Sequence, residues 1–314
     1  MKTYFNSVGG FLVLACFILI CPFSNAQWKQ SGDPIGGTVN VNCLLAAGNK
    51  LFAGTDVGVF LSSNNGANWT EVNSGISNLQ INALAVAGSN LFAGTNGGGV
   101  FLSSDFGTSW TDVNTGFNNS FIQIGALAVS GTTIFAGTLL DGRVLVSENN
   151  GTSWTEVYTG ITATNVQALM VSGTSLFAGT DNGLFVSSSN GVSWATVTTG
   201  LASPTIQALA VLGTNLFAGT GNGVILSVNN GLTWTKVSTG LTANNVQAMT
   251  ASGTSVFAGT NGGGVFMSAN NGKSWTAVNT GLSNLDVQAL AATESSLFSG
   301  IHNGGVFTLL IKAH

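Results

Sequence analysis

Ionisable side chains that could perform chemistry are scarce in this chain, in which charged residues make up only 6% of 314 residues. The candidates lie between stretches of apolar residues, and they are Asp33, Asp56, Asp141, Asp181, Asp286 and His302. Hydrolysis of a glycosidic bond needs two carboxyl groups about 5 to 10 Å apart. The elements that carry these side chains therefore decide whether any two of them can cooperate.

A hairpin built from Ser, Asn or Asp, Gly and Trp recurs six times along the chain. Its copies are SSNNGANW from Ser62, SSDFGTSW from Ser103, SENNGTSW from Ser147, SSSNGVSW from Ser187, SVNNGLTW from Ser227 and SANNGKSW from Ser268. A unit that recurs about every forty residues and cannot bury its own apolar face is typical of repeat proteins whose neighbouring units share a core.

Each repeat contains four short runs of alternating apolar and polar residues, separated by turn residues. In one repeat the first three runs are 166–173, 175–180 and 183–188, and the fourth follows the Trp of the hairpin. Four strands in a unit of this length indicate a propeller blade. The Ala-rich first strand would line the axis, and the Trp-bearing fourth strand would lie outside.

The two ends of the chain supply complementary parts of one repeat. Trp28 begins a fourth strand that has no first three strands before it, whereas residues 289–311 contain three strands and no fourth. We therefore expect residues 27–314 to form an all-β, seven-bladed β-propeller of four-stranded antiparallel blades. The N-terminal strand would complete the last blade and close the ring, which removes open sheet edges.

Two of the four connections in each repeat have a constant length, and the other two vary. The spacing from the Leu or Met of the first strand to the Phe of the second strand is always 8 residues. The spacing from the apolar residue of the third strand to the hairpin Trp is always 9 residues. The other two spacings range from 15 to 17 and from 8 to 10 residues. Because successive strands alternate in direction, the variable connections share one face, and variable loops on a constant scaffold usually carry binding.

The widest departures from the repeat are the loops 116–125 and 138–143, which adjoin each other around the third blade. They would present an apolar centre and a cation, a combination that suits a protein partner. The candidate binding residues on the variable face are Phe117, Phe121, Leu139, Leu140, Asp141, Arg143, Asp56, Asp181 and His302. Ordinary loop insertions are the alternative, because surface insertions cost little.

The repeated hairpin itself is expected to be structural. Its Asn or Asp can accept hydrogen bonds from turn amides, its Gly supplies a positive φ, and its Trp can be buried between blades. Only Asp105 is ionisable at the acidic position, so neither catalysis nor calcium binding is expected there. The expected structural residues are Trp69, Trp110, Trp154, Trp194, Trp234, Trp275, Gly66, Gly107, Gly151, Gly191, Gly231 and Gly272.

These hairpins resemble the Asp-box (BNR) repeat of sialidase-type propellers over residues 27–314, since Ser, Gly and Trp are present in all six copies. The resemblance implies the fold rather than an activity. The same box is found in sialidases, xyloglucanases, sortilin-like receptors and photosystem II stability/assembly factors, and in those families it lies away from the active face.

Several features of the sequence argue against an enzymatic function. Sialidases are similar to one another in an Arg triad, a Tyr nucleophile and an Asp acid/base, whereas this chain has one arginine, Arg143, and one tyrosine beyond the leader, Tyr158. The Arg-rich binding face that the assembly-factor resemblance implies is missing for the same reason. Asp56 and Asp181 occupy equivalent positions in the first and fourth repeats, on opposite sides of a ring. His302 holds that position in the seventh repeat, and we expect it to be a solvated side chain.

Residues 1–26 have the layout of a secretory signal peptide, with Lys2, an apolar run at 11–21 and a small-residue end before Gln27. The apolar run of 11 residues is shorter than the ~20 needed to cross a bilayer. We expect export, to the periplasm or cell envelope or as a secreted protein. Acylation at Cys16 is the alternative. Removal of the signal peptide would leave Cys43 as the single cysteine, expected to be a small buried residue.

The charge balance excludes one class of partner. The part after residue 26 carries 6 basic and 11 acidic groups, without the basic stripe that nucleic-acid binding requires. No cofactor, metal site or membrane span is expected. The sequence therefore predicts an exported, non-catalytic propeller that acts as a protein-interaction or scaffold module. A glycan-binding propeller is the first alternative, and a diverged glycoside hydrolase is the second.

Overall fold

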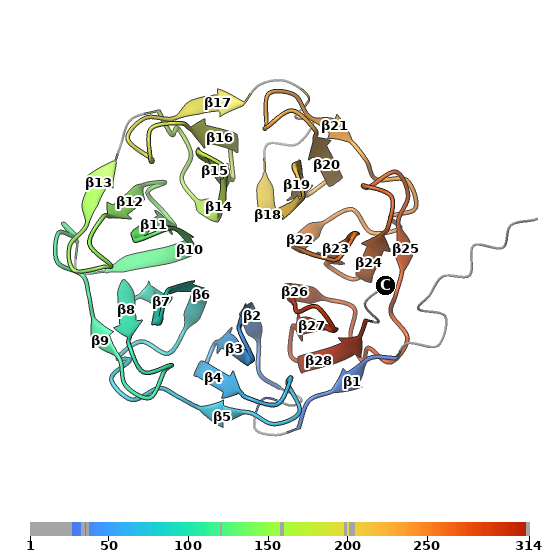
Figure 1. Cartoon of the computed structure of the whole chain (residues 1–314), viewed down its shortest axis with the longest axis horizontal. Coiled ribbons are helices and arrows are strands. Elements are labelled where there is room, and N and C mark those ends of the chain that lie inside the picture. Colours follow the sequence, from blue (N-terminus) through green and yellow to red (C-terminus); the bar gives the residue numbers. More distant parts are fainter. Residues whose placement is uncertain are drawn as a thin grey trace, which may run out of the picture.

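The structure is a computed structural model that describes residues 27–32, 35, 38–119, 121–157, 160–197, 200 and 205–311. The expected signal peptide, Asp33 and Tyr158 lie outside the described residues. The described residues form 28 β-strands and no helix. Figure 1 shows that the strands are grouped in sheets around a common centre. The all-β, radial architecture expected from the repeats is confirmed.

Each of four sheets contains four consecutive strands that pair antiparallel in chain order. The first contains β2 (Val41–Ala47), β3 (Lys50–Thr55), β4 (Gly58–Ser62) and β5 (Thr70–Glu71). The others contain β14 (Val166–Ser172), β15 (Ser175–Thr180), β16 (Gly183–Ser187) and β17 (Ala195–Val197); β18 (Ile206–Leu212), β19 (Asn215–Thr220), β20 (Gly223–Ser227) and β21 (Thr235–Lys236); and β22 (Val246–Ser252), β23 (Ser255–Thr260), β24 (Gly264–Ser268) and β25 (Thr276–Ala277).

Two further groups of four strands are joined into one eight-stranded sheet. Their strands are β6 (Ile81–Ala87), β7 (Asn90–Gly97), β8 (Val100–Ser103), β9 (Thr111–Asp112), β10 (Ile122–Ser130), β11 (Thr133–Thr138), β12 (Val144–Ser147) and β13 (Thr155–Val157). The link is a short pairing of β10 with β7, in which Ile122 lies opposite Gly97 and Gln123 opposite Asn96. The sequence did not indicate this link.

The last sheet combines the two ends of the described chain. It contains β26 (Val287–Ala292), β27 (Ser296–Ile301), β28 (Gly305–Leu310) and β1 (Lys29–Gln30). Strand β1 pairs antiparallel with β28, with Lys29 opposite Thr308 and Gln30 opposite Phe307. In Figure 1 β1 lies at the outer edge of this sheet and β26 at its inner edge.

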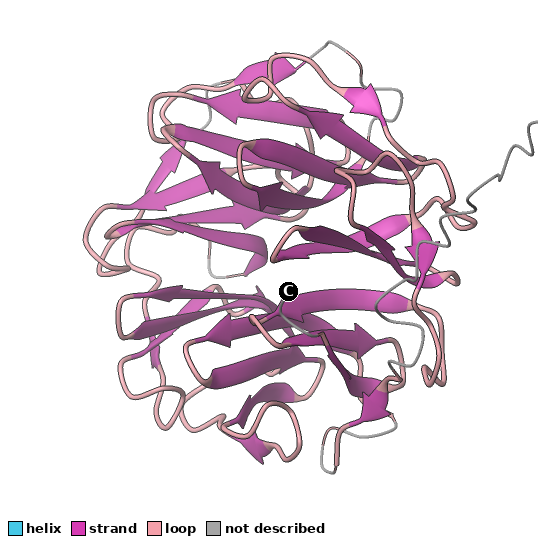
Figure 2. Cartoon of the chain, turned by 45° about the vertical axis from the view of Figure 1, so that its right-hand side comes forward, coloured by secondary structure: helices cyan, strands magenta, loops and turns pink. Residues whose placement is uncertain are grey.

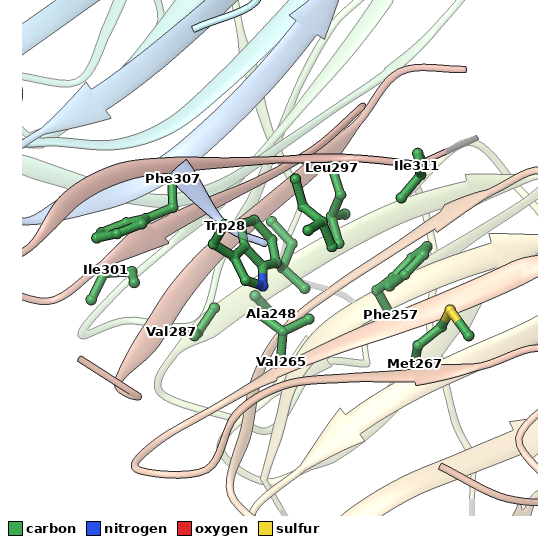
Figure 3. Close-up of a cluster of buried hydrophobic side chains, with 12 residues drawn as sticks. Trp28, Ala248, Phe257, Val265, Met267, Val287, Leu297, Ile301, Phe307 and Ile311 are labelled. Atoms are coloured by element: carbon green, nitrogen blue, oxygen red, sulfur yellow. The ribbon is translucent and has the colours of Figure 1, made fainter. Parts of the chain in front are cut away.

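The core lies between the sheets rather than within any one of them. One cluster joins β22–β24 to β26–β28 and includes Trp28, Phe257, Val265, Val287 and Phe307 (Figure 3). The slanting sheets in Figure 2 pack face to face in this way. Since a small four-stranded sheet cannot bury its apolar faces alone, each sheet depends on its neighbours for stability.

The first strand of each group of four, which lies nearest the centre, contains a register shift at the same place in the repeat. Val41 lies opposite Thr55 and Cys43 opposite Gly54, so Asn42 between them is an extra residue, a β-bulge. The equivalent bulged residues of the other sheets are Asn82, Gly125, Gln167, Gln207, Gln247 and Gln288. A bulge changes the direction of a side chain relative to a regular strand.

Candidate functional site

The two ends of each sheet carry different connections. In the first sheet, Val41 at the start of β2 pairs with Thr55 at the end of β3, whereas the β2–β3 turn joins Ala47 to Lys50 at the other end. The loops that enter the innermost strands and those after the second strands therefore share one end, which we call the loop face. The Trp hairpins lie at the other end, which we call the hairpin face.

The two widest loops meet on the loop face. Leu139 N–H donates to the carbonyl oxygen of Gln123 at 2.9 Å, which joins the segment after β11 to the start of β10. The side chain of Phe121, which precedes β10, is 59% exposed, and that of Leu140, which follows β11, is 68% exposed. Each of the two loops thus exposes one large apolar side chain to solvent, and we call Phe121 and Leu140 together the apolar corner.

The backbone of Leu140 is unusual. Its φ of +76° lies in the left-handed region, which is costly for a branched apolar residue. Leu140 N–H donates to Asn165 Oδ1 at 3.1 Å, and this bond from the neighbouring sheet holds the conformation. Because the Leu140 side chain is exposed, its burial does not offset the cost of this backbone conformation. Strain of this kind in a surface loop is a reason to suspect a contact outside the chain.

Phe121 is held at the corner by a glycine. Gly97 has a φ of +113°, and the Phe121 ring lies directly against it, where any larger residue would collide. Phe121 N–H also donates to Asn119 Oδ1 at 3.0 Å. The aromatic ring is therefore positioned by its own loop and by β7, although one of its sides stays exposed to solvent.

Arg143 does not supply the exposed cation that the sequence suggested. Its guanidinium pairs with the carboxylates of Asp141 and Glu156, and the side chains of Arg143 and Glu156 are only 12% and 5% exposed. Burial alone would raise the pKa of Asp141, but hydrogen bonds from Arg143 and Thr138 hold it below its usual value. The pKa of Arg143 is raised, chiefly by the hydrogen bond to Asp141. The ion pairs order the 138–143 loop instead of offering a free charge.

Phe117 and Leu139 are more deeply placed than the apolar corner. The Phe117 ring packs against Trp154 with a centroid separation of 5.6 Å, so part of it belongs to the core. Its other side lines a pocket of about 390 Å³ with Asp112, Asn114 and Ile122. Leu139 is half-buried and lies over Gly125. These two side chains therefore offer less exposed apolar surface than Phe121 and Leu140 do.

Asp56 and Asp181 are used within the loop face. Asp56 accepts hydrogen bonds from the main-chain and side-chain nitrogens of Asn40, at 3.2 and 3.1 Å. Asp181 accepts them from both main-chain and side-chain groups of Thr164 and Asn165. Burial would raise the pKa of Asp181, but these bonds lower it below its usual value. Each carboxylate therefore ties two loops of its own sheet together.

These carboxylates do not form a pair. Asp56 and Asp181 follow β3 and β15, which lie across the centre from each other in Figure 1. Within the described ranges, no group of three or more His, Cys, Asp or Glu side chains could hold a metal ion. The arrangement offers hydrogen bonding and apolar contact rather than acid–base chemistry at one bond.

His302 directly follows β27, and its ring contacts the innermost strand of the same sheet. The main-chain N–H of His302 donates to the carbonyl oxygen of Asp286 at 3.0 Å. The ring Nδ1 of His302 lies 3.1 Å from Nε2 of Gln288. His302 therefore contacts a bulged glutamine instead of being merely solvated, as the sequence analysis expected.

A ring of carboxamides from the innermost strands was not predicted from the sequence. The ring encloses a pocket of about 290 Å³ lined by Asn42, Asn82, Gln167, Gln207, Gln247 and Gln288. The signal in the sequence was an Asn or Gln before Ala-Leu, Ala-Met or Cys-Leu in six of the repeats. Its meaning depends on the β-bulge, which only the strand register reveals.

The hairpins fold through the same contacts in each copy. In the first, Gly66 N–H donates to Ser62 Oγ at 2.9 Å, and Asn68 N–H donates to Asn64 Oδ1 at 2.9 Å. Asn65 and Gly66, which lie in the same turn, both have a positive φ. In the second copy, hydrogen bonds from Ser109 and then Ser103 lower the pKa of Asp105 to about 2.

The hairpin tryptophans are buried, as is Trp28, and four indoles donate a hydrogen bond to a neighbouring sheet. The acceptors of Trp28, Trp110, Trp154 and Trp275 are the carbonyl oxygens of Val278, Val72, Val113 and Val237. The Trp hairpins therefore connect adjacent sheets. Cys43 is half-buried, and desolvation raises the pKa of its thiol to about 12, which disfavours the reactive thiolate.

Comparison with known proteins identifies the architecture. The family model described as the DUF6242 beta propeller domain matches residues 22–123 and 126–238. No curated protein matches the sequence. The described part of the chain also contains no helix with the length and hydropathy needed to cross a membrane.

Solved structures are similar in fold at low sequence identity. The extracellular domain assigned to the hybrid two component system BT4673 of B. thetaiotaomicron is 15% identical, with a TM-score of 0.73, over 90% of this chain and 39% of that one. For the GH74 xyloglucanase from Xanthomonas campestris the values are 17%, 0.70, 90% and 53%. For YCF48 from Cyanidioschyzon merolae they are 14%, 0.70, 91% and 98%. The chain thus spans about two fifths of the BT4673 domain.

Proposed function

The chain belongs to the DUF6242 β-propeller family, and we propose that it is a non-catalytic binding propeller whose loop face contacts a protein partner. The observation that carries the proposal is the apolar corner, where Phe121 and Leu140 are exposed and Leu140 adopts a strained backbone. Exposed apolar groups on an ordered scaffold are typical of protein contacts.

The partner would be held mainly by apolar contact. Arg143 is paired with Asp141 and Glu156, so its charge is largely compensated and it acts as a positioning residue for Leu140. Asn118 and Asn119, on the exposed rim of the neighbouring pocket, can add hydrogen bonds around the apolar centre. An apolar centre with a polar rim is the usual anatomy of an interface between proteins.

Affinity capture tests this proposal. The Phe121→Ser/Leu140→Asn double variant should lose the partner that the wild-type protein captures from an envelope extract of its source. The matched control is Leu232→Asn, because Leu232 is 74% exposed and belongs to the hairpin face. Equal capture by the double variant would reject the corner as the contact surface.

The same proposal includes the number of blades. We infer seven blades of the Asp-box type, with β6–β9 and β10–β13 counted as two blades that β7 and β10 bridge. Pairing of β1 with β28 supports closure of the ring by the N-terminal segment. Deletion of residues 27–32 should then lower the melting temperature markedly, since it exposes β28 and removes Trp28 from its cluster.

We further infer that the protein is exported. The support is the signal-like layout of residues 1–26 and the extracellular location stated for the similar BT4673 domain. N-terminal sequencing of the mature protein tests this, and we expect it to begin at Gln27. A chain that starts at Met1 in the cytoplasm would contradict export.

A glycoside hydrolase is the competing hypothesis, and the similarity to a GH74 xyloglucanase is the observation that favours it. Against it stand Asp56 and Asp181, which are hydrogen-bonded into loops of separate sheets. Incubation with xyloglucan, followed by a reducing-sugar assay, decides between the two functions. Our proposal expects no release of product.

A further inference from the structure

The carboxamide ring has a geometry that a simple structural role does not require. In six of the seven groups of four strands the bulged residue of the innermost strand is Asn or Gln, and all six side chains line the same pocket. Bulges of this kind often re-aim a side chain next to a binding site. Six of the seven repeats thus direct one neutral polar side chain towards this pocket.

The asparagines and glutamines of the ring differ in what they contact. Asn42 Nδ2 donates to the carbonyl oxygen of Ile81 at 2.9 Å, and Asn82 Nδ2 donates to that of Ile124 at 3.1 Å. Both bonds connect neighbouring sheets. The side-chain oxygens of four glutamines are instead buried and accept no hydrogen bond from any described residue, and these are Gln167, Gln207, Gln247 and Gln288.

Unpaired buried acceptors are costly and therefore call for a donor. A carboxamide can donate through its nitrogen and accept through its oxygen, and a half-turn about its last bond exchanges the two. A hydroxyl group also both donates and accepts. Several hydroxyl groups on one ligand could consequently satisfy the ring whichever way each amide is turned.

The charge of the pocket selects against ions. All six lining side chains are uncharged. Calcium and magnesium sites usually include carboxylates, which this lining lacks. An ammonium group can only donate hydrogen bonds, so it would engage the oxygen of each carboxamide and leave the nitrogen without a partner. A neutral ligand avoids the desolvation of a charge that nothing in the lining compensates.

The third group of four strands, β10–β13, contributes no carboxamide to the ring. Its bulged residue is Gly125, and a Cβ placed there would lie 2.6 Å from Cδ2 of Leu139. Leu139 therefore occupies the space that the seventh side chain would need. A sugar carries several hydroxyl groups, each of which can donate to a carboxamide oxygen or accept from a carboxamide nitrogen.

We propose that the pocket inside the carboxamide ring is a second binding site, for one residue of a neutral saccharide held by the carboxamides of Gln167, Gln207, Gln247 and Gln288. The pocket volume of about 290 Å³ lies near the lower limit of small-molecule sites, which are roughly 300 to 1,000 Å³. It therefore suits a single sugar or the end of a glycan chain. This site is separate from the apolar corner and does not depend on the proposed protein partner.

Saturation-transfer NMR and calorimetric titration with glucose, galactose, N-acetylglucosamine and cellotetraose test the site. At least one of these probes should bind the wild-type protein, and the Gln207→Met/Gln247→Met variant should bind it at least about tenfold more weakly. Methionine preserves the shape of glutamine while removing the unpaired amide. The melting temperature should therefore stay unchanged or rise.

Two controls keep the outcome specific. Asn222→Ala removes an exposed amide after β19, outside the ring, and should leave sugar binding unchanged. The Phe121→Ser/Leu140→Asn variant should also bind sugar normally, so a failure of the protein-contact proposal would be distinguishable from a failure of this one. If the methionine variant does not fold, sugar-induced shifts of glutamine side-chain amide signals in the wild-type protein provide the readout.

The proposal is overturned if none of the four sugars binds, or if the methionine variant binds them as tightly as the wild-type protein does. It is also overturned if calcium chloride or methylammonium chloride binds at the ring while the sugars do not. That result would identify the ring as an ion site.

Discussion

The indole N–H of Trp110 donates a hydrogen bond to the carbonyl oxygen of Val72 at 2.8 Å, although the two residues belong to neighbouring sheets. The Trp110 ring is also buried in the cluster that joins these sheets. The hairpin thus delivers both apolar area and a hydrogen bond to the adjacent sheet. Not every copy does so, because the indole nitrogens of Trp69 and Trp194 have no hydrogen-bond partner among the described residues.

This difference predicts unequal costs for the same substitution. Trp110→Phe should destabilise the protein by about 1 kcal/mol more than Trp194→Phe, since it leaves the Val72 carbonyl without its donor. Full removal of the ring in Trp194→Ala should cost about 3 to 5 kcal/mol through the cavity that it leaves. Urea unfolding measures all three values. Equal costs for the two Phe variants would mean that the indole hydrogen bond contributes nothing.

The hairpin glycine is the second stability residue to test. Gly191 has a φ of +82°, and a Cβ there would lie 3.3 Å from Cγ2 of Val146. Gly191→Val should lower the melting temperature strongly, because a β-branched residue disfavours this conformation. The adjacent Val192→Ala is the matched control, since that side chain is exposed and should tolerate truncation. Lost ligand binding at an unchanged melting temperature would contradict a structural role for Gly191.

The second hairpin should make stability depend on pH in the acid range. Its Asp105 has a pKa lowered to about 2 by hydrogen bonds from Ser109 and Ser103, whereas the ordinary value in an unfolded chain is about 3.9. The unfolded chain therefore binds the proton more tightly. The stabilisation is complete above about pH 4 and is lost as the pH falls towards about 2.

Asp105→Asn isolates this contribution, because Asn is the residue at the same position of four other hairpins. The difference in melting temperature between the wild-type protein and the variant should shrink as the pH falls through that window. Thermal unfolding monitored by circular dichroism measures it. A difference that stays constant from neutral to acid pH would show that the carboxylate charge does not stabilise the hairpin.

The aspartates of the loop face should matter for loop order and not for turnover. Asp181→Asn keeps the shape of the side chain but weakens its acceptor bonds to Thr164 and Asn165, so faster hydrogen exchange is expected in that loop. Asp56→Asn should act in the same way on Asn40. Hydrolysis of sialosides or β-glucans that disappears in either variant would identify these carboxylates as catalytic.

The repeats predicted the strands well because hydrophobic alternation and turn residues are local signals. The second strand of the first repeat, expected around LFAGT, is β3 from Lys50 to Thr55. The β7–β10 link was not foreseeable in this way, because it depends on how Gly97 and Ile122 meet in space.

Side-chain partners were harder to predict than strands. Arg143 was expected to be an exposed cation, but Glu156, which is 13 residues away in the chain, lies next to it across the pairing of β12 and β13. The carboxamide ring was not predicted from the sequence for a related reason. A Gln in an apolar strand reads as an outward polar position until the bulge shows where it points.

The most direct test of the account is the affinity of the purified partner for variants of the two faces. Once the captured partner is purified, its dissociation constant can be measured by calorimetry. We expect the constant to be at least about tenfold higher for Phe121→Ser/Leu140→Asn than for the wild-type protein. Leu232→Asn and Lys273→Glu, both on the hairpin face, should bind like the wild-type protein. Normal binding by the double variant together with weakened binding by the hairpin-face variants would contradict the account, because the contact surface would then be the opposite face.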